Sequence, residues 1–160
     1  MIIFSIIAMG LGYAVVAGKS ALLVSDIPTQ LRQNVLFALM PMVRELRQTA
    51  SAEINLAEGA SSNSIIFKMP YDNNADGVVV DNIGNVEWGQ DITYARDGLG
   101  QLTRTSGGIT AVIAPNIATL QFSRPVGQDE LIQIDITVAK ADGLGNLYQD
   151  AEQMIVKMRN

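Results

Sequence analysis

The spacing of apolar residues changes twice along the chain. Residues 1–24 contain a single charged side chain, that of Lys19. From Ile27 to Leu46 the apolar residues recur every three or four positions, as they do on one face of a helix. The helical pattern fades near Ala57, EGASSNS is typical of a loop, and from Asn63 apolar and polar residues alternate, which is typical of a half-buried strand. The pattern therefore predicts a helical part over 1–57 and a β part over 58–160.

The helical part is expected to have two different surroundings. As an α-helix, residues 1–24 would extend roughly 36 Å, at about 1.5 Å per residue, and about 20 apolar residues are enough to cross a bilayer. This segment is therefore predicted to lie in a membrane or in the core of an assembly. The amphipathic segment 25–57 is expected to pack on the β part. Kinks are expected at Pro28 and Pro41, because proline removes a backbone donor.

Two other interpretations of the first segment fit the sequence less well. A phosphate-binding loop has four residues between its first glycine and Gly-Lys-Ser, whereas five residues separate Gly12 from Gly18. A cleavable secretion signal begins with positive residues, and no Lys or Arg precedes Lys19. The glycines Gly10, Gly12 and Gly18 suit close helix packing or a local opening of the helix.

The β part contains alternating segments separated by turn sequences. The clearest strands are SIIFKM, LIQIDITVAK and EQMIVKMRN, and shorter candidates are VVV, DITYAR, QLTRT, ITAVIA and ATLQFS. The breaks are rich in Asp, Asn and Gly, as in the DGLG at 97–100 and 142–145. Since no second helical pattern separates the strands, the sheet is expected to be antiparallel. The predicted fold class is α+β: a long N-terminal helix, apolar and then amphipathic, packed on one antiparallel β-sheet domain.

Composition narrows the possible chemistry. The net charge of −5 argues against a nucleic-acid partner, which requires a basic surface. The chain has no Cys and no His, which excludes Cys/His zinc sites, thiol nucleophiles and Ser-His-Asp triads. The carboxylates that remain as candidates fall in turn sequences, where turn formation explains them. We therefore expect no enzymatic activity.

The sequence YDNNADG contains the first half of a calcium-binding loop. Asp72, Asn74 and Asp76 place oxygens at alternate positions, where they can converge on one cation, and Gly77 permits the sharp turn. The glutamate that completes such a loop at its twelfth position is replaced by Ile83. Calcium at these three residues is the one cofactor that the sequence suggests.

Five segments carry a resemblance to a known family. They are MVRELRQTA near the end of the predicted helix, GQLTRTSGG, VIAPNIATLQF, IQIDITVAKADGLGN and the final IVKMRN. Together with the order of a helix and then a sheet, they resemble the type IV pilin superfamily. Within it, the segments are most similar to the prepilin-type minor pilins and the J-type minor pseudopilins of type II secretion. The resemblance implies a pilin-like fold.

The resemblance also implies a function, that of a structural subunit of a pilus-like or pseudopilus filament. The helix would form the filament core and the β domain would face outward. The partners would be copies of the chain or related pilins, and the inner-membrane assembly machinery. The protein would reside in the inner membrane before assembly and in a periplasmic or extracellular filament afterwards. The alternative is a periplasmic binding module, anchored by one membrane span, that never polymerises.

The resemblance assigns assembly roles to residues of the first segment. Met1 matches the first residue of mature family members, and is either exposed by cleavage of a leader or the initiator. The family has Glu at the fifth mature position, where it neutralises a neighbour's N-terminal amine, and this chain has Ser5 there. The role of that Glu is therefore assigned to no residue here. The candidates for the place where family helices unwind in the filament are Gly10, Gly12, Gly18 and Pro28.

Lys19 is the one charge within the apolar segment, and an unpaired ammonium in a hydrocarbon-like environment is costly. The nearest acidic residue, Asp26, lies about 10 Å further along a helix, which is too far for contact within one chain. We expect Lys19 to pair with Asp26 of a neighbouring subunit and so to set the filament register. The alternative is that Lys19 points into a wet groove where the helix opens near Gly18.

Overall fold

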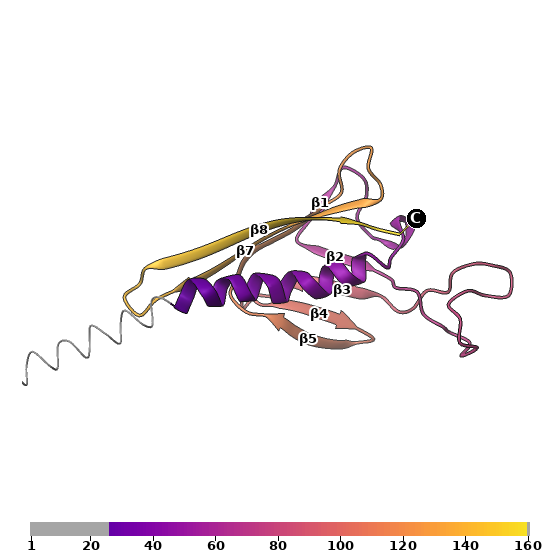
Figure 1. Ribbon diagram of the computed structural model, residues 1–160, viewed down its shortest axis with the longest axis horizontal. Coiled ribbons are helices and arrows are strands. Elements are labelled where there is room, and N and C mark those ends of the chain that lie inside the picture. The colour runs from indigo at the N-terminus through magenta and orange to yellow at the C-terminus, as the bar shows by residue number, and fades with distance from the viewer. Residues whose placement is uncertain (1–25, 160) are drawn as a thin grey trace, which may run out of the picture.

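The computed structural model describes residues 26–159, which contain an α-helix, a short 3-10 helix and eight strands. The α-helix covers residues 26–46, and the 3-10 helix η1 covers Ser51–Glu53. The strands are β1 (Ser61–Ser62), β2 (Ser64–Phe67), β3 (Ile92–Arg96), β4 (Leu102–Ser106), β5 (Ile109–Ala114), β6 (Ile117–Ser123), β7 (Leu131–Ala141) and β8 (Leu147–Lys157). Figure 1 shows the helix running along one side of the strands.

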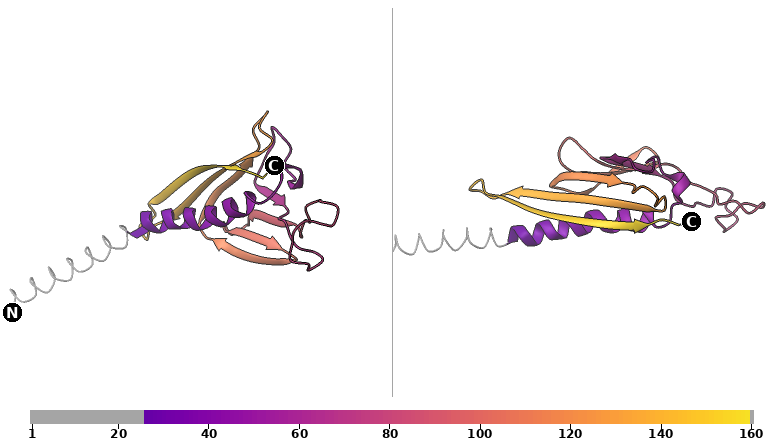
Figure 2. Two further views of the ribbon diagram at one scale, coloured as in Figure 1. Left: turned by 45° about the vertical axis from the view of Figure 1, so that its right-hand side comes forward. Right: turned by 90° about the horizontal axis from the view of Figure 1, so that it is seen from above.

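The strands form two sheets of four strands each. One sheet has the order β1-β6-β7-β8 and the other has the order β2-β3-β4-β5, and neighbouring strands within each sheet are antiparallel. The longest pairing joins β7 and β8, from Leu131 opposite Lys157 to Ala141 opposite Leu147. In Figure 2 the view from above shows the helix on one side of both sheets.

The predicted fold class is contradicted by this arrangement. The prediction was a pilin-like α+β fold with one long helix, reaching about residue 57, packed on a single sheet. The described residues are instead mostly antiparallel β structure in two four-stranded sheets, and their one α-helix is short and ends at Leu46. The apolar segment 1–24 lies outside the described residues.

Contacts with distant parts of the chain end the helix at Leu46. The Thr49 hydroxyl donates a hydrogen bond to the Lys68 carbonyl at 2.6 Å, and the Thr49 carbonyl accepts one from the Arg159 N–H at 2.9 Å. The next residue, Ala50, has extended backbone and forms a parallel bridge with Arg159. The helix-forming residues after Leu46 are thus held in another conformation, because tertiary contacts override a weak local preference.

The division into two sheets follows from a segment that changes its partner strand. Ser61 and Ser62 pair with β6, whereas the residues from Ser64 onward pair with β3. The Ser62 hydroxyl accepts a hydrogen bond from the Ser64 N–H at 3.2 Å, which stabilises the step between the two pairings. Between β5 and β6, Pro115 offers no N–H to a ladder and Asn116 has a positive φ of 63°. Both breaks separate what the alternating pattern presents as a continuous β part.

One core contains the buried face of the helix and the inner faces of both sheets. The helix contributes Ile27, Leu31, Val35, Ala38, Leu39, Met42 and Leu46. The strands contribute large side chains that include Phe67, Tyr94 and Phe122, and the rings of Phe67 and Tyr94 stack with centroids 6.1 Å apart. This shared core fixes which face of the helix remains on the surface.

The individual strand predictions are mostly confirmed. In β7 the alternating residues Ile132, Ile134, Ile136 and Val138 are buried, as their spacing predicts. Strand β8 is longer than predicted, since it begins at Leu147 rather than near Glu152. The segment VVV at 78–80 is not a strand: its side chains are exposed and only Val80 forms a bridge, with Val86.

Candidate functional site

The helix carries a second apolar surface, which is exposed to solvent, unlike its buried face. Leu36, Phe37 and Met40 are 51%, 62% and 68% exposed. Met40 lies one helical turn after Leu36 and Phe37, so the three side chains form one contiguous patch, which we call the outer helix face. These exposed apolar side chains make the outer helix face a candidate surface for contact with another molecule.

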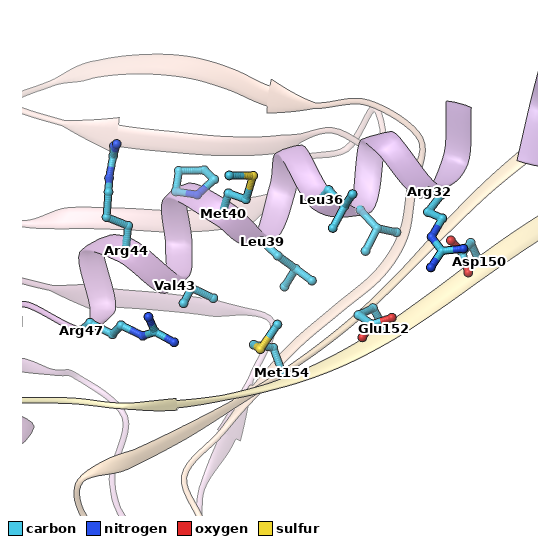
Figure 3. A pocket seen from close by; sticks show the side chains of 12 residues that line it. Arg32, Leu36, Leu39, Met40, Val43, Arg44, Arg47, Asp150, Glu152 and Met154 are labelled. Atoms are coloured by element: carbon cyan, nitrogen blue, oxygen red, sulfur yellow. The ribbon is translucent and has the colours of Figure 1, made fainter. Parts of the chain in front are cut away.

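A groove separates this patch from strand β8. Its volume is about 810 Å³. The residues around it are Arg32, Val35, Leu36, Leu39, Met40, Pro41, Val43, Arg44 and Arg47 on the helix and Asp150, Glu152 and Met154 on β8. Figure 3 shows the side chains of Leu39, Val43 and Met154 pointing toward the space between the helix and β8. The groove therefore has an apolar floor.

Opposite charges line the two walls of the groove. Arg32, Arg44 and Arg47 come from the helix, and Asp150 and Glu152 come from β8. Three ion pairs are present within residues 26–159, and none of them includes one of these five side chains. Their charges are free to meet charges of opposite sign on a partner, which would orient that partner in the groove.

A buried polar cluster lies under the last turn of the helix. Glu45 is 6% exposed and Tyr94, on β3, is fully buried. The Tyr94 hydroxyl donates a hydrogen bond to Glu45 Oε2 at 3.1 Å. Arg104 Nε, on β4, donates to Glu45 Oε1 at 3.2 Å and to Oε2 at 3.0 Å. A carboxylate with two such partners fixes the rotation of the helix over the β2-β3-β4-β5 sheet, and hence the direction in which the outer helix face points.

The position of Glu45 in the sequence is a signal for this cluster, which the pattern of apolar residues alone does not show. Glu45 lies three residues after Met42, on the buried stripe of the helix, where a charge is buried only when it is paired. The position of Glu45 thus calls for a basic or donor partner. Nothing in the sequence identifies Arg104 or Tyr94 as that partner, because 59 and 49 residues separate them from Glu45.

Stability is expected to fall in alkali because of Tyr94. Burial, followed by the charge and hydrogen bond of Glu45, raises the pKa of Tyr94 above its ordinary value. An unfolded tyrosine ionises near pH 10, so the stabilisation from neutral Tyr94 is complete below about pH 10 and is lost as the pH rises further. Urea unfolding at a series of pH values should show a steeper alkaline loss for the wild type than for Tyr94→Phe. Equal slopes would contradict this assignment.

The residues of the predicted calcium loop are brought together, but their oxygens face the loop's own backbone. Asp72 Oδ2 accepts a hydrogen bond from the Gly77 N–H at 2.8 Å, and Asn74 Oδ1 accepts one from the Asp76 N–H at 2.9 Å. Asp76 Oδ1 in turn accepts from the Val78 N–H at 2.9 Å. Across residues 26–159, no group of three or more Asp, Glu, His or Cys side chains is placed to hold a metal ion. Calcium binding at the loop stays a prediction.

Calcium titration gives a direct measurement of the loop. If it binds the ion in the native state only, saturating calcium raises the melting temperature, since a hundredfold excess over Kd adds about 2.7 kcal/mol. Asp72→Ala and Asp76→Ala should each remove that increase and leave the melting temperature in chelator nearly unchanged. A wild-type melting temperature that is the same in calcium and in chelator would show that the loop binds no calcium.

Most of the predicted assembly residues lie outside the described part of the chain. These are Met1, Ser5, Gly10, Gly12, Gly18 and Lys19. Of the others, Asp26 and Pro28 are exposed in the first turn of the described helix. The Asp26 side chain is therefore accessible to a neighbouring molecule. Within residues 26–159, no helix is long and apolar enough to cross a membrane.

Comparison of the chain with protein-family models, with curated proteins and with solved structures finds no match.

Proposed function

We propose that the protein is a structural subunit of a pilus-like or pseudopilus filament. In this proposal residues 1–24 form the filament core together with the same segment of neighbouring copies, and the β sheets face outward. The observation that carries the proposal is the outer helix face, formed by Leu36, Phe37 and Met40. It lies on the helix that follows the apolar segment in the sequence, so the folded part of the chain offers a second apolar contact surface besides residues 1–24.

The apolar side chains available for burial support association between copies of the chain rather than small-molecule binding in the groove alone. Fully burying one large apolar side chain is worth about 1.5–3 kcal/mol, so the outer helix face contributes only a few kcal/mol to an interface. Residues 1–24 offer many more such side chains. In this proposal both surfaces contact neighbouring copies, and the unpaired charges around the groove select the orientation of the neighbouring copy.

Before assembly the apolar segment requires another apolar environment, which in this proposal is the inner membrane. Because lipid is as apolar as a filament core, transfer from one to the other yields little free energy. Inner-membrane assembly machinery is therefore part of the proposal as the source of work. The predicted pairing of Lys19 with Asp26 of a neighbouring copy remains part of the proposal, and the exposure of Asp26 agrees with it.

Electron microscopy of the purified full chain tests the proposal. After removal of detergent, a filament subunit should form filaments with helical symmetry. Mass spectrometry of the native protein adds a second readout, since an N-methylated Met1 would establish processing of the prepilin type. Dispersed, membrane-bound monomers without any filament would instead favour the anchored binding module.

Single charges on the outer helix face should weaken assembly without unfolding the protein. Phe37→Asp and Met40→Asp each remove one large side chain from the interface, and a loss of about 1.5–3 kcal/mol raises the critical concentration about tenfold to a hundredfold. Sedimentation of filaments at graded concentrations measures this effect. Ile109→Asp is the matched control, because Ile109 is 76% exposed but lies on β5, an edge strand of the β2-β3-β4-β5 sheet, and not on the helix. Wild-type assembly by both helix variants would refute the interface.

A further inference from the structure

The turn between β7 and β8 holds two exposed leucines in a fixed conformation. Leu144 is 79% exposed and Leu147 is 62% exposed. Asp142 Oδ1 accepts hydrogen bonds from the Leu144 N–H at 2.8 Å and from the Asn146 N–H at 2.9 Å, and Gly145 adopts a positive φ of 87°. These contacts stabilise the turn, so the leucines are presented to the outside by an ordered tip.

This turn lies at the end of the molecule where the described helix begins. Lys140 Nζ donates a hydrogen bond to Gln30 Oε1 at 2.8 Å. A small cavity is lined by Pro28, Leu31 and Arg32 from the helix and by Tyr148, Gln149 and Asp150 from β8. Both views of Figure 2 show the β7–β8 hairpin reaching the first turn of the helix.

The hairpin reaches at least as far as the start of the helix. Asp26 precedes Gln30 by four residues, which is about 6 Å along a helix axis. Beyond Lys140, β7 continues for one more residue, to Ala141, and the turn with its tip at Leu144 extends further in the same direction. The tip at Leu144 therefore lies near the level of Asp26, where the apolar segment 1–24 joins the described part of the chain, and Leu147, opposite Ala141, lies just behind the tip.

We infer that Leu144 and Leu147 insert into the surface of the bilayer that holds residues 1–24 before assembly. This inference rests on the proposed function, because it requires the apolar segment to lie in a membrane. The occupant is a lipid surface because the chain enters the folded part at this end of the molecule, directly after a segment of membrane length. The insertion would hold the hairpin, and with it the helix, in one orientation relative to the bilayer.

The side chains next to the leucines suit the boundary between lipid and water. Tyr148 pairs with Lys140 across the two strands, and both have an apolar body with a polar end. The carboxylate of Asp142 does not face lipid without compensation. Its second oxygen, Oδ2, accepts hydrogen bonds from Asn146 Nδ2 at 2.9 Å and from the Tyr148 hydroxyl at 3.4 Å.

The chain contains a matched turn that serves as a control. Asp81 Oδ1 accepts hydrogen bonds from the Ile83 N–H at 3.0 Å and the Asn85 N–H at 2.8 Å, which is the pattern of the β7–β8 turn. Ile83 is also 79% exposed. It lies in the long loop between β2 and β3, which Figure 1 shows at the end of the molecule opposite the start of the helix. The two turns thus differ in position and not in geometry or exposure.

Site-specific labelling of the full chain separates the two turns. Because the chain has no Cys, Leu144→Cys and Ile83→Cys each create one attachment site for a small environment-sensitive fluorophore. Each labelled chain is reconstituted at low density into phosphatidylcholine vesicles, with iodide as quencher on both sides of the bilayer. In vesicles, the label at 144 should emit at a shorter wavelength and should be quenched by iodide much less than in the detergent-free labelled filament. The label at 83 should be quenched by iodide to the same extent in both.

Each outcome decides between the inference and the function on which it rests. If the chain floats with the vesicles but the label at 144 is quenched as strongly as the label at 83, the inference is wrong and membrane anchoring stands. If the chain does not float with the vesicles, residues 1–24 do not hold it in a membrane. That part of the proposed function is then wrong, and the inference is wrong with it. Protection at 144 that appears only as the protein density rises, or only in filaments, would assign the turn to a contact between copies and overturn the inference.

Discussion

Glu45→Ala is expected to lower the free energy of unfolding by about 3 kcal/mol, near the lower end of the range for breaking a buried ion pair. The substitution leaves the Tyr94 hydroxyl and the Arg104 guanidinium without their common acceptor. Tyr94 is fully buried, so its hydroxyl gains no water in exchange. The Arg104 side chain is 26% exposed, and the water that reaches it keeps the loss from being larger.

Urea unfolding of the chain without residues 1–24 measures this loss, since that fragment contains the whole described core. Glu53→Ala is the matched control. It breaks an ion pair with Lys68, at 3.4 Å, whose side chains are 24% and 41% exposed, and pairs of this kind contribute about 1 kcal/mol or less. Equal losses for the two variants would show that the Glu45 cluster is no more important than a surface pair.

Glu45→Gln distinguishes the charge of the carboxylate from its shape. Glutamine retains one acceptor oxygen for the Tyr94 hydroxyl but provides no charge for Arg104. The expected loss of unfolding free energy is therefore smaller than for Glu45→Ala. It should decrease further at high salt, because salt ions screen the attraction between Glu45 and the partly exposed Arg104 in the wild type. A glutamine variant as unstable as the alanine variant would assign the whole effect to charge.

The sequence predicted strands better than it predicted where elements end. Alternation identifies β7 correctly because each of its inward residues is apolar over a long run. The end of the helix depends instead on Thr49, whose hydroxyl bonds to a carbonyl 19 residues away and whose carbonyl bonds to Arg159. No local pattern encodes such partners, which is why the helix was predicted to be longer than it is.

The separation into two sheets was also beyond the reach of local patterns. The sequence predicts a strand from Ser64 but none at Ser61–Ser62, and the two sheets arise because β1 pairs with β6 whereas β2 pairs with β3. The outer helix face was visible in part, since Leu36, Phe37 and Met40 are apolar residues off the buried stripe. The groove beside it was not visible, because it depends on where β8 lies relative to the helix.

Deletion of residues 1–24 is expected to abolish filament formation completely and to leave the fold intact. The buried residues that form the described core all lie between Ile27 and Met158, so the truncated chain keeps that core and should unfold cooperatively as a monomer. The deletion removes more than ten large apolar side chains, each worth about 1.5–3 kcal/mol when buried, whereas Phe37→Asp removes one. The truncated chain should therefore show no filaments at any concentration, while the Phe37 variant still assembles at a raised critical concentration. Circular dichroism and electron microscopy on the same sample separate loss of assembly from loss of fold. Filaments from a folded, truncated chain would place the filament core in the β sheets or the outer helix face and would remove the apolar segment from the interface.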